Sequence, residues 1–92
     1  MAKPALEPQA RIDQLLAEML EGVSAEEAVY LAALLVNRGA TELHKRIRAG
    51  ANARRGADDW GTWAGLQNAA RNLVLQSSTC RDSAAALTGR KR

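Results

Sequence analysis

The chain has 92 residues, of which 47% are hydrophobic and 25% are charged, and this composition predicts one small globular domain and excludes a disordered chain. The formal charge of +3 is unevenly spread, because residues 1–36 carry a net charge of −4 and residues 37–92 carry +7. Halves of opposite charge can attract each other within one fold or between two copies, or present a basic face to a polyanion.

The location of the protein is predicted from what the sequence lacks. Cys80 is the only cysteine, so no disulfide can form within the chain, as is usual in a reducing compartment. No apolar run approaches the roughly 18 residues of a transmembrane helix, and no apolar segment of a signal peptide follows Met1. We therefore expect a cytoplasmic protein that is not inserted in a membrane.

The first third of the chain predicts an extended leader and two helices. Both prolines lie within residues 1–8, and we expect residues 1–7 to be extended. Residues 8–21 have the apolar spacing of an amphipathic helix, and Gly22 stands where a left-handed C-cap is expected. Ser24 and Glu27 form a capping box that opens a second helix, which we expect to end at Arg38-Gly39.

The next segment predicts a short helix followed by an irregular turn. Thr41 is the expected N-cap of a third helix reaching about Ala49, with Glu42 and Arg46 as an i,i+4 ion pair. Gly50 and Gly56 then bracket a loop. The alternative is one long, glycine-interrupted helix over residues 41–55.

The last third predicts one longer helix and a short one. Asp58 or Asp59 is the expected N-cap of a fourth helix that runs to about Ser78. Asp82 is the expected start of a short fifth helix over residues 83–87, closed by Gly89. We expect residues 89–92 to be a mobile basic tail.

These elements predict an all-α fold, a compact bundle of four or five short helices in a single domain over residues 1–92. The second helix is apolar almost all round, so we expect it at the centre, packed by the first and fourth helices. We expect Leu16, Leu35 and Leu73 to lie in the core. Alanine is abundant, which favours helix and lets neighbouring helices approach closely.

No residue pattern points to catalysis or to a bound metal. A Cys–His pair of Cys80 and His44, with Asp82 as third member, has no supporting local motif. We predict instead a surface histidine and a half-buried thiol. One histidine and one cysteine cannot form a structural zinc site within one chain. We therefore predict no catalytic residue, no metal and no cofactor, and a protein that is not an enzyme.

The sequence matches two known patterns only in part, and neither match assigns a family. A helix-turn-helix with Gly39 as its turn glycine would need an apolar residue where Lys45 stands. Trp63-Ala64-Gly65 has the form of the Trp-x-Gly turn of small secreted helical-hairpin proteins, in which it lies in the loop between two long helices. Here we expect it inside a helix, and no Tyr-x-x-x-Asp/Glu follows.

The remaining candidates are binding residues. We predict a small helical protein that binds a larger protein target as a regulator or inhibitor, of the kind made by bacteria or phages, with Trp60, Arg54 and Arg55 as contact residues. The alternative is a nucleic-acid-binding accessory protein that uses the basic segment 38–55. A second alternative is a structural subunit of a homo-oligomer or particle. The basic segment contributes Arg38, Lys45, Arg46, Arg48, Arg54 and Arg55.

Overall fold

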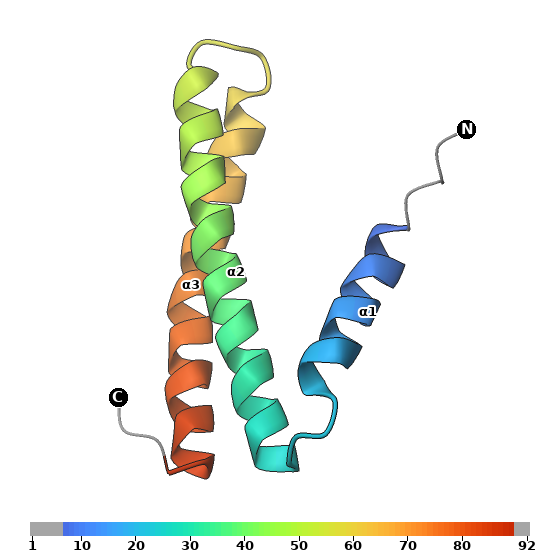
Figure 1. Cartoon of the computed structure of the whole chain (residues 1–92). Helices are drawn as coiled ribbons and strands as arrows, with labels where there is room; N and C mark the ends of the chain where they lie inside the picture. Colours follow the sequence, from blue (N-terminus) through green and yellow to red (C-terminus); the bar gives the residue numbers. More distant parts are fainter. Residues whose placement is uncertain (1–6, 90–92) are drawn as a thin grey trace, which may run out of the picture.

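A computed structural model describes residues 7–89 and shows three α-helices, with no strand among these residues (Figure 1). The helices are α1 (Pro8–Leu20), α2 (Ala25–Ala53) and α3 (Trp60–Leu87). Helices α2 and α3 run antiparallel as a long hairpin, and α1 diverges from the start of α2 (Figure 1). The molecule measures 49 × 44 × 13 Å, so the hairpin and α1 form a flat, V-shaped arrangement.

The all-α class is confirmed, but the prediction of four or five short helices in a compact bundle is wrong. The expected second and third helices are one helix, because Gly39 lies inside α2. A single glycine costs a helix only about 1 kcal/mol relative to alanine, and packing against α3 on both sides of Gly39 offsets that cost. Thr41 does not cap a new helix; its hydroxyl donates to the carbonyl oxygen of Asn37 within α2, at 2.9 Å.

The helix predicted for residues 41–49 also continues through Gly50 to Ala53, as the glycine-interrupted alternative proposed. The loop over residues 54–59 is therefore shorter than expected, and Gly56 adopts a positive φ of 81° in it. The expected fourth and fifth helices are likewise merged in α3. Asp82 does not start a helix, because it lies inside α3; its carboxylate accepts hydrogen bonds from the neighbouring Arg81.

Three of the residues predicted at helix ends, Ser24, Gly22 and Gly89, have the expected roles. The Ser24 hydroxyl accepts a hydrogen bond from the backbone N–H of Glu27 at 3.1 Å. Gly22 and Gly89 have φ values of 73° and 71° just beyond the ends of α1 and α3. Residues 1–6 of the expected leader and 90–92 of the expected basic tail lie outside the described residues.

Helices α2 and α3 meet along a seam that repeats every seven residues. The seam positions alternate in steps of three and four residues in both helices, which is the a/d pattern of a coiled coil. Small side chains dominate the most buried of these positions, and this allows the helices to approach closely. The buried seam residues are Ala33, Asn37, Ala40, Ile47 and Ala51 from α2 and Ala70, Ser77 and Ala84 from α3.

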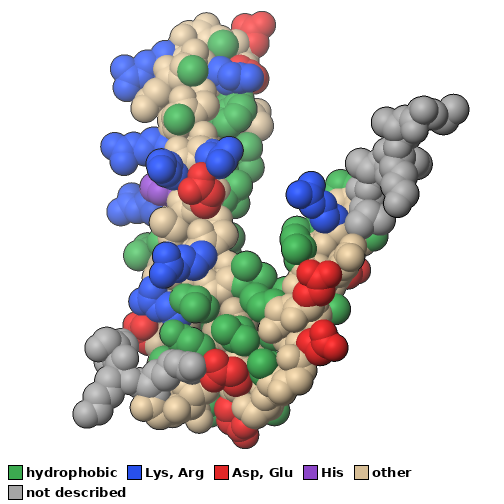
Figure 2. Space-filling view, viewed as in Figure 1, with side chains coloured by type: hydrophobic (Ala, Val, Ile, Leu, Met, Phe, Trp, Pro, Cys, Tyr) green, Lys and Arg blue, Asp and Glu red, His purple; other side chains and the backbone are tan. Residues whose placement is uncertain are grey.

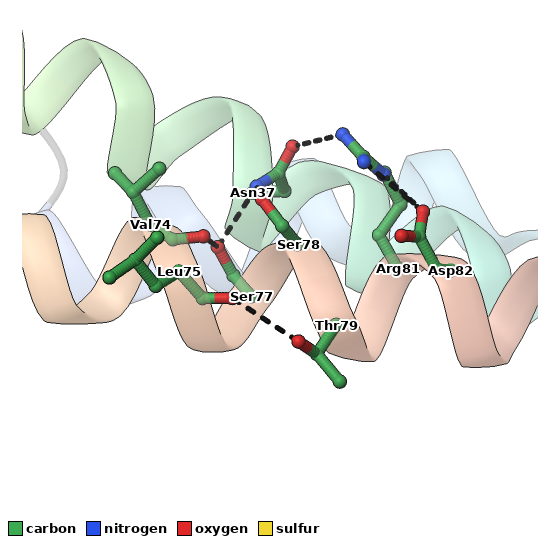
Figure 3. Close-up of polar contacts among 8 residues, drawn as sticks. All are labelled: Asn37, Val74, Leu75, Ser77, Ser78, Thr79, Arg81 and Asp82. Atoms are coloured by element: carbon green, nitrogen blue, oxygen red, sulfur yellow. Dashed lines mark hydrogen bonds and ion pairs between the residues drawn. The ribbon is translucent and has the colours of Figure 1, made fainter.

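A polar cluster in the middle of the seam fixes which residues face each other (Figure 3). The side-chain amide of Asn37 donates to the hydroxyls of Ser77 and Ser78, each at 3.0 Å. Its oxygen accepts from Nη1 of Arg81 at 2.8 Å. Because a buried amide without partners costs about 1–3 kcal/mol, any sliding of one helix past the other is penalised. Asn37 therefore sets the register of the hairpin.

The expected leucine-rich core does not form. Leu35 and Leu73 are 44% and 41% exposed, and α1 has no buried residue, so Leu16 is only partly covered. The second helix contacts both neighbours as expected, but α1 touches it only near the turn (Figure 1). None of the helices within residues 7–89 combines the length and apolar character needed to cross a membrane.

Candidate protein-binding face

One side of the hairpin carries a continuous line of large apolar side chains that α3, α2 and α1 leave partly uncovered. These residues recur every seven positions and directly flank the seam, at the g positions of the heptad repeat. In an antiparallel helix pair the g positions of the two helices lie on the same side of the seam. We call this set the apolar face; it consists of Val29, Val36, Leu43, Leu66, Leu73 and Leu87, which are 41–58% exposed.

The apolar face contains an open groove near the loop end of the hairpin. Its volume is about 310 Å³, and its lining is almost wholly apolar. The ring of Trp63 closes one end of the groove by lying against the backbone of Gly50. The full lining is Leu43, Ile47, Trp63, Leu66, Ala69, Ala70 and Leu73. The groove therefore has the volume and the apolar lining to accept aliphatic side chains from another helix.

Hydrophobic energetics show why this face is a candidate interface. Complete burial of a valine or leucine side chain is worth about 1.5–3 kcal/mol, so covering the exposed half of each would contribute roughly 1 kcal/mol per side chain. Within residues 7–89 no large side chain is completely buried. The hairpin thus has a small core of its own and a larger apolar area available for a partner.

The residues predicted to contact a protein lie together at the loop end of the hairpin. Trp60 is 45% exposed in the first turn of α3, and Arg55 is exposed in the loop. Arg54 is engaged within the chain: its Nε donates to the carboxylate of Asp59 at 3.0 Å, and its guanidinium carbon lies 4.7 Å from the centre of the Trp63 ring. Arg54 therefore positions Trp63 at the end of the groove.

The expected capping role of Asp59 is replaced by this contact. Asp59 is the N-cap residue of α3, but its side chain makes no capping hydrogen bond. The same carboxylate oxygen accepts from Nε1 of Trp63 at 3.3 Å and from Arg54. The Trp63-Ala64-Gly65 sequence thus lies in the first turns of α3, immediately after the loop between the long helices, and inside a helix as expected.

The predicted basic segment lies mainly on the other side of the hairpin (Figure 2). Hydrophobic side chains follow the edge turned toward α1, and lysines and arginines follow the opposite edge (Figure 2). Arg46 forms the expected ion pair with Glu42 at 2.6 Å, and Arg54 is held by Asp59. Within residues 25–89, the exposed lysines and arginines to which the structure gives no ion-pair partner are Arg38, Lys45, Arg48, Arg55 and Arg71.

The one conceivable catalytic pair is separated by the hairpin register. Because Asn37 faces Ser77 and Gly50 faces Trp63, His44 lies level with Ala70, and Cys80 lies level with Leu34. These levels differ by ten residues of helix, or about 15 Å along its axis. Cys80 is exposed, not half-buried as predicted. Within residues 7–89 no three His, Cys, Asp or Glu side chains are grouped to hold a metal ion.

The groove was not predicted from the sequence, although the sequence contains a signal for it. The signal is a seven-residue spacing of apolar side chains, which places them in two lines beside the seam. The first line is Val29, Val36 and Leu43, and the second is Leu66, Leu73, Cys80 and Leu87.

Comparison of the chain with known proteins finds no matching family model, no similar curated protein and no similar solved structure.

Proposed function

We propose that the protein acts by binding another protein, as a regulator or inhibitor of a larger target, and that the apolar face of the hairpin is its binding surface. The observation that carries the proposal is the groove at Leu43, Ile47 and Trp63, which continues into a row of half-exposed leucines and valines. Monomeric soluble proteins rarely leave such an area uncovered, and contiguous apolar patches of this kind mark interaction sites.

The shape of the face favours a helix as the bound element. The groove lies between two antiparallel helices. A third helix can pack along it through the apolar side chains at its own positions i, i+3, i+4 and i+7. Trp60 and Arg55 lie beyond one end of the groove, where they can contact the target's flanking residues. Tryptophan and arginine are the side chains most often found at binding hot spots.

The test is a comparison of two arginine variants at similarly exposed leucines. Leu73→Arg places a charge in the groove, and Leu75→Arg places the same charge on the outer side of α3, where Leu75 is 60% exposed. Each tagged protein is incubated with extract of the native host, and the captured proteins are quantified by mass spectrometry. We expect Leu73→Arg to reduce recovery of the target at least tenfold, because an unpaired charge would be buried in an apolar contact.

Leu75→Arg should recover the target as the wild type does, and circular dichroism should show the same helicity for all three proteins. Recovery of the same proteins in the same amounts by wild type and Leu73→Arg would contradict the proposed surface.

A second candidate function rests on the opposite edge of the hairpin. We infer that Arg38, Lys45, Arg48 and Arg71 could contact the phosphates of a nucleic acid, because they are exposed and lie along one edge. On duplex DNA the slope of log affinity against log salt concentration changes by about 0.9 for each phosphate contact. We expect the triple variant with glutamine at residues 38, 45 and 48 to bind with a slope shallower by roughly 2.7. A wild type that fails to bind duplex DNA or RNA at low salt would remove this candidate.

A further inference from the structure

We propose that the apolar face is also a homodimer interface, in which two copies pack antiparallel and each places its α1 in the groove of the other. This proposal rests on the proposed function, because both assign helix binding to the same face. In the absence of a target, a second copy of this chain covers the apolar face.

The distribution of apolar residues within each helix points to a bundle larger than two helices. A two-stranded coiled coil needs apolar residues only at a and d, whereas helices in larger bundles carry a third apolar position at e or g. Here the g positions hold valines and leucines in both α2 and α3, while the seam between them holds mainly alanines. The hairpin therefore has the pattern of helices in a larger bundle, in which a further helix covers the g positions.

The α1 helix of the same copy cannot fill the groove. Its 13 residues span about 20 Å, and α2 with 29 residues spans about 43 Å. Because α1 is joined to the start of α2, laying it flat against the hairpin would bring it only as far as about residue 38. The groove begins beyond that level, at Leu43. A second copy running in the opposite direction brings its α1 to the required level.

Charge selects the antiparallel arrangement over the parallel one. Residues 7–27, which include α1, carry six acidic residues and one arginine, a net charge of −5. Residues 43–73, which surround the groove, carry six basic and two acidic residues, a net charge of +4. An antiparallel dimer places each acidic end beside the basic end of the other copy, whereas a parallel dimer places like charges together.

The apolar side chains of α1 fit this role. Ile12 and Leu15 are each 53% exposed. The hydrophobic edge of the hairpin faces the space between the two arms of the V, which are the hairpin and α1 (Figure 2). In the proposed dimer the loop end of each hairpin enters the V of the other copy. The same surface patch is then used by both copies, as twofold symmetry requires.

The first test measures the mass of the purified full chain by sedimentation equilibrium over a range of concentrations. We expect twice the chain mass of 9.9 kDa for the wild type and for Leu75→Arg. We expect the Leu43→Arg/Leu73→Arg double variant to keep its helicity while its dimer dissociation constant rises at least 100-fold. A wild type that is monomeric at all concentrations would overturn the proposal, and it would leave the target capture described above intact.

The second test distinguishes the two orientations. Two copies carrying Cys80→Ser are made, one with Leu15→Cys in α1 and one with Ala69→Cys in the groove, and they are mixed and oxidised. The antiparallel dimer predicts a mixed disulfide between the two variants. Preferential linkage of the Ala69→Cys copy to itself would show a parallel arrangement and overturn the proposal.

Discussion

Ile47→Asp should unfold the hairpin. Ile47 is 7% exposed, lies in the seam and lines the groove. Removing a buried isoleucine side chain costs about 2–5 kcal/mol, and desolvating the new carboxylate adds to that. The total is comparable to the free energy of unfolding of a whole small domain, about 5–15 kcal/mol.

Leu35→Asp is the matched control, because it also replaces a branched aliphatic side chain by aspartate, about three turns earlier in the same helix. Leu35 is 44% exposed on the outer side of α2, so its loss should cost no more than about 1 kcal/mol. Urea titrations followed by circular dichroism at 222 nm measure both variants. Cooperative unfolding of Leu35→Asp at a midpoint near that of wild type is expected; equal loss of structure in both variants would show that α2 is covered on its outer side.

The contrast between these two residues shows how far the sequence alone determines the fold. The apolar periodicity of residues 28–36 correctly predicts a helix, but it does not reveal which of its apolar residues are covered. Leu35 was expected in the core because leucine is usually buried there. The structure instead buries Ala33, Asn37 and Ala40, whose small or polar side chains do not stand out in a hydrophobic pattern.

Three helix ends were predictable from local chemistry, whereas the caps expected at Thr41, Asp59 and Asp82 do not form. Ser24, Gly22 and Gly89 act within one turn of the backbone, so their roles can be recognised without knowledge of the partner helix. The continuity of α2 through Gly39 and Gly50 depends instead on packing against α3. That contact connects residues about 40 apart, as between Asn37 and Ser77, and no local propensity reports it.

The candidate site also combines features that follow from local sequence with features that depend on contacts between the two helices. Trp60, Arg54 and Arg55 were predicted as contact residues, and the structure places all three at the loop end of the hairpin, because they are close in sequence. The groove requires Leu43, Leu66 and Leu73 to lie on the same side of the seam, which depends on the register fixed by Asn37. The seven-residue recurrence of these leucines was visible, but only the hairpin shows that the two lines lie on one side.

Gly50→Ala should destabilise the protein, although alanine is the better helix former. A Cβ atom at Gly50 would lie 2.8 Å from Cη2 and 2.9 Å from Cε3 of Trp63, with Cζ3 closer still. The indole cannot simply swing away, because Asp59 accepts a hydrogen bond from its Nε1 and Arg54 lies over the ring. Overpacking of this kind costs about 1–3 kcal/mol, which exceeds the gain of about 1 kcal/mol in helix propensity.

Gly39→Ala provides the comparison, since Gly39 lies in the same helix and a Cβ atom there meets nothing within 4 Å. It should raise the free energy of unfolding by about 0.5–1 kcal/mol. Urea midpoints of the two variants, with indole fluorescence recorded in a Trp60→Phe background, measure both stability and the position of Trp63. Equal stabilisation by both substitutions would mean that Trp63 does not rest on Gly50, and the groove would then lack the wall that closes its end. A lower midpoint for Gly50→Ala alone, with altered Trp63 emission, would instead show that the contact between the two helices at the loop end shapes the binding face.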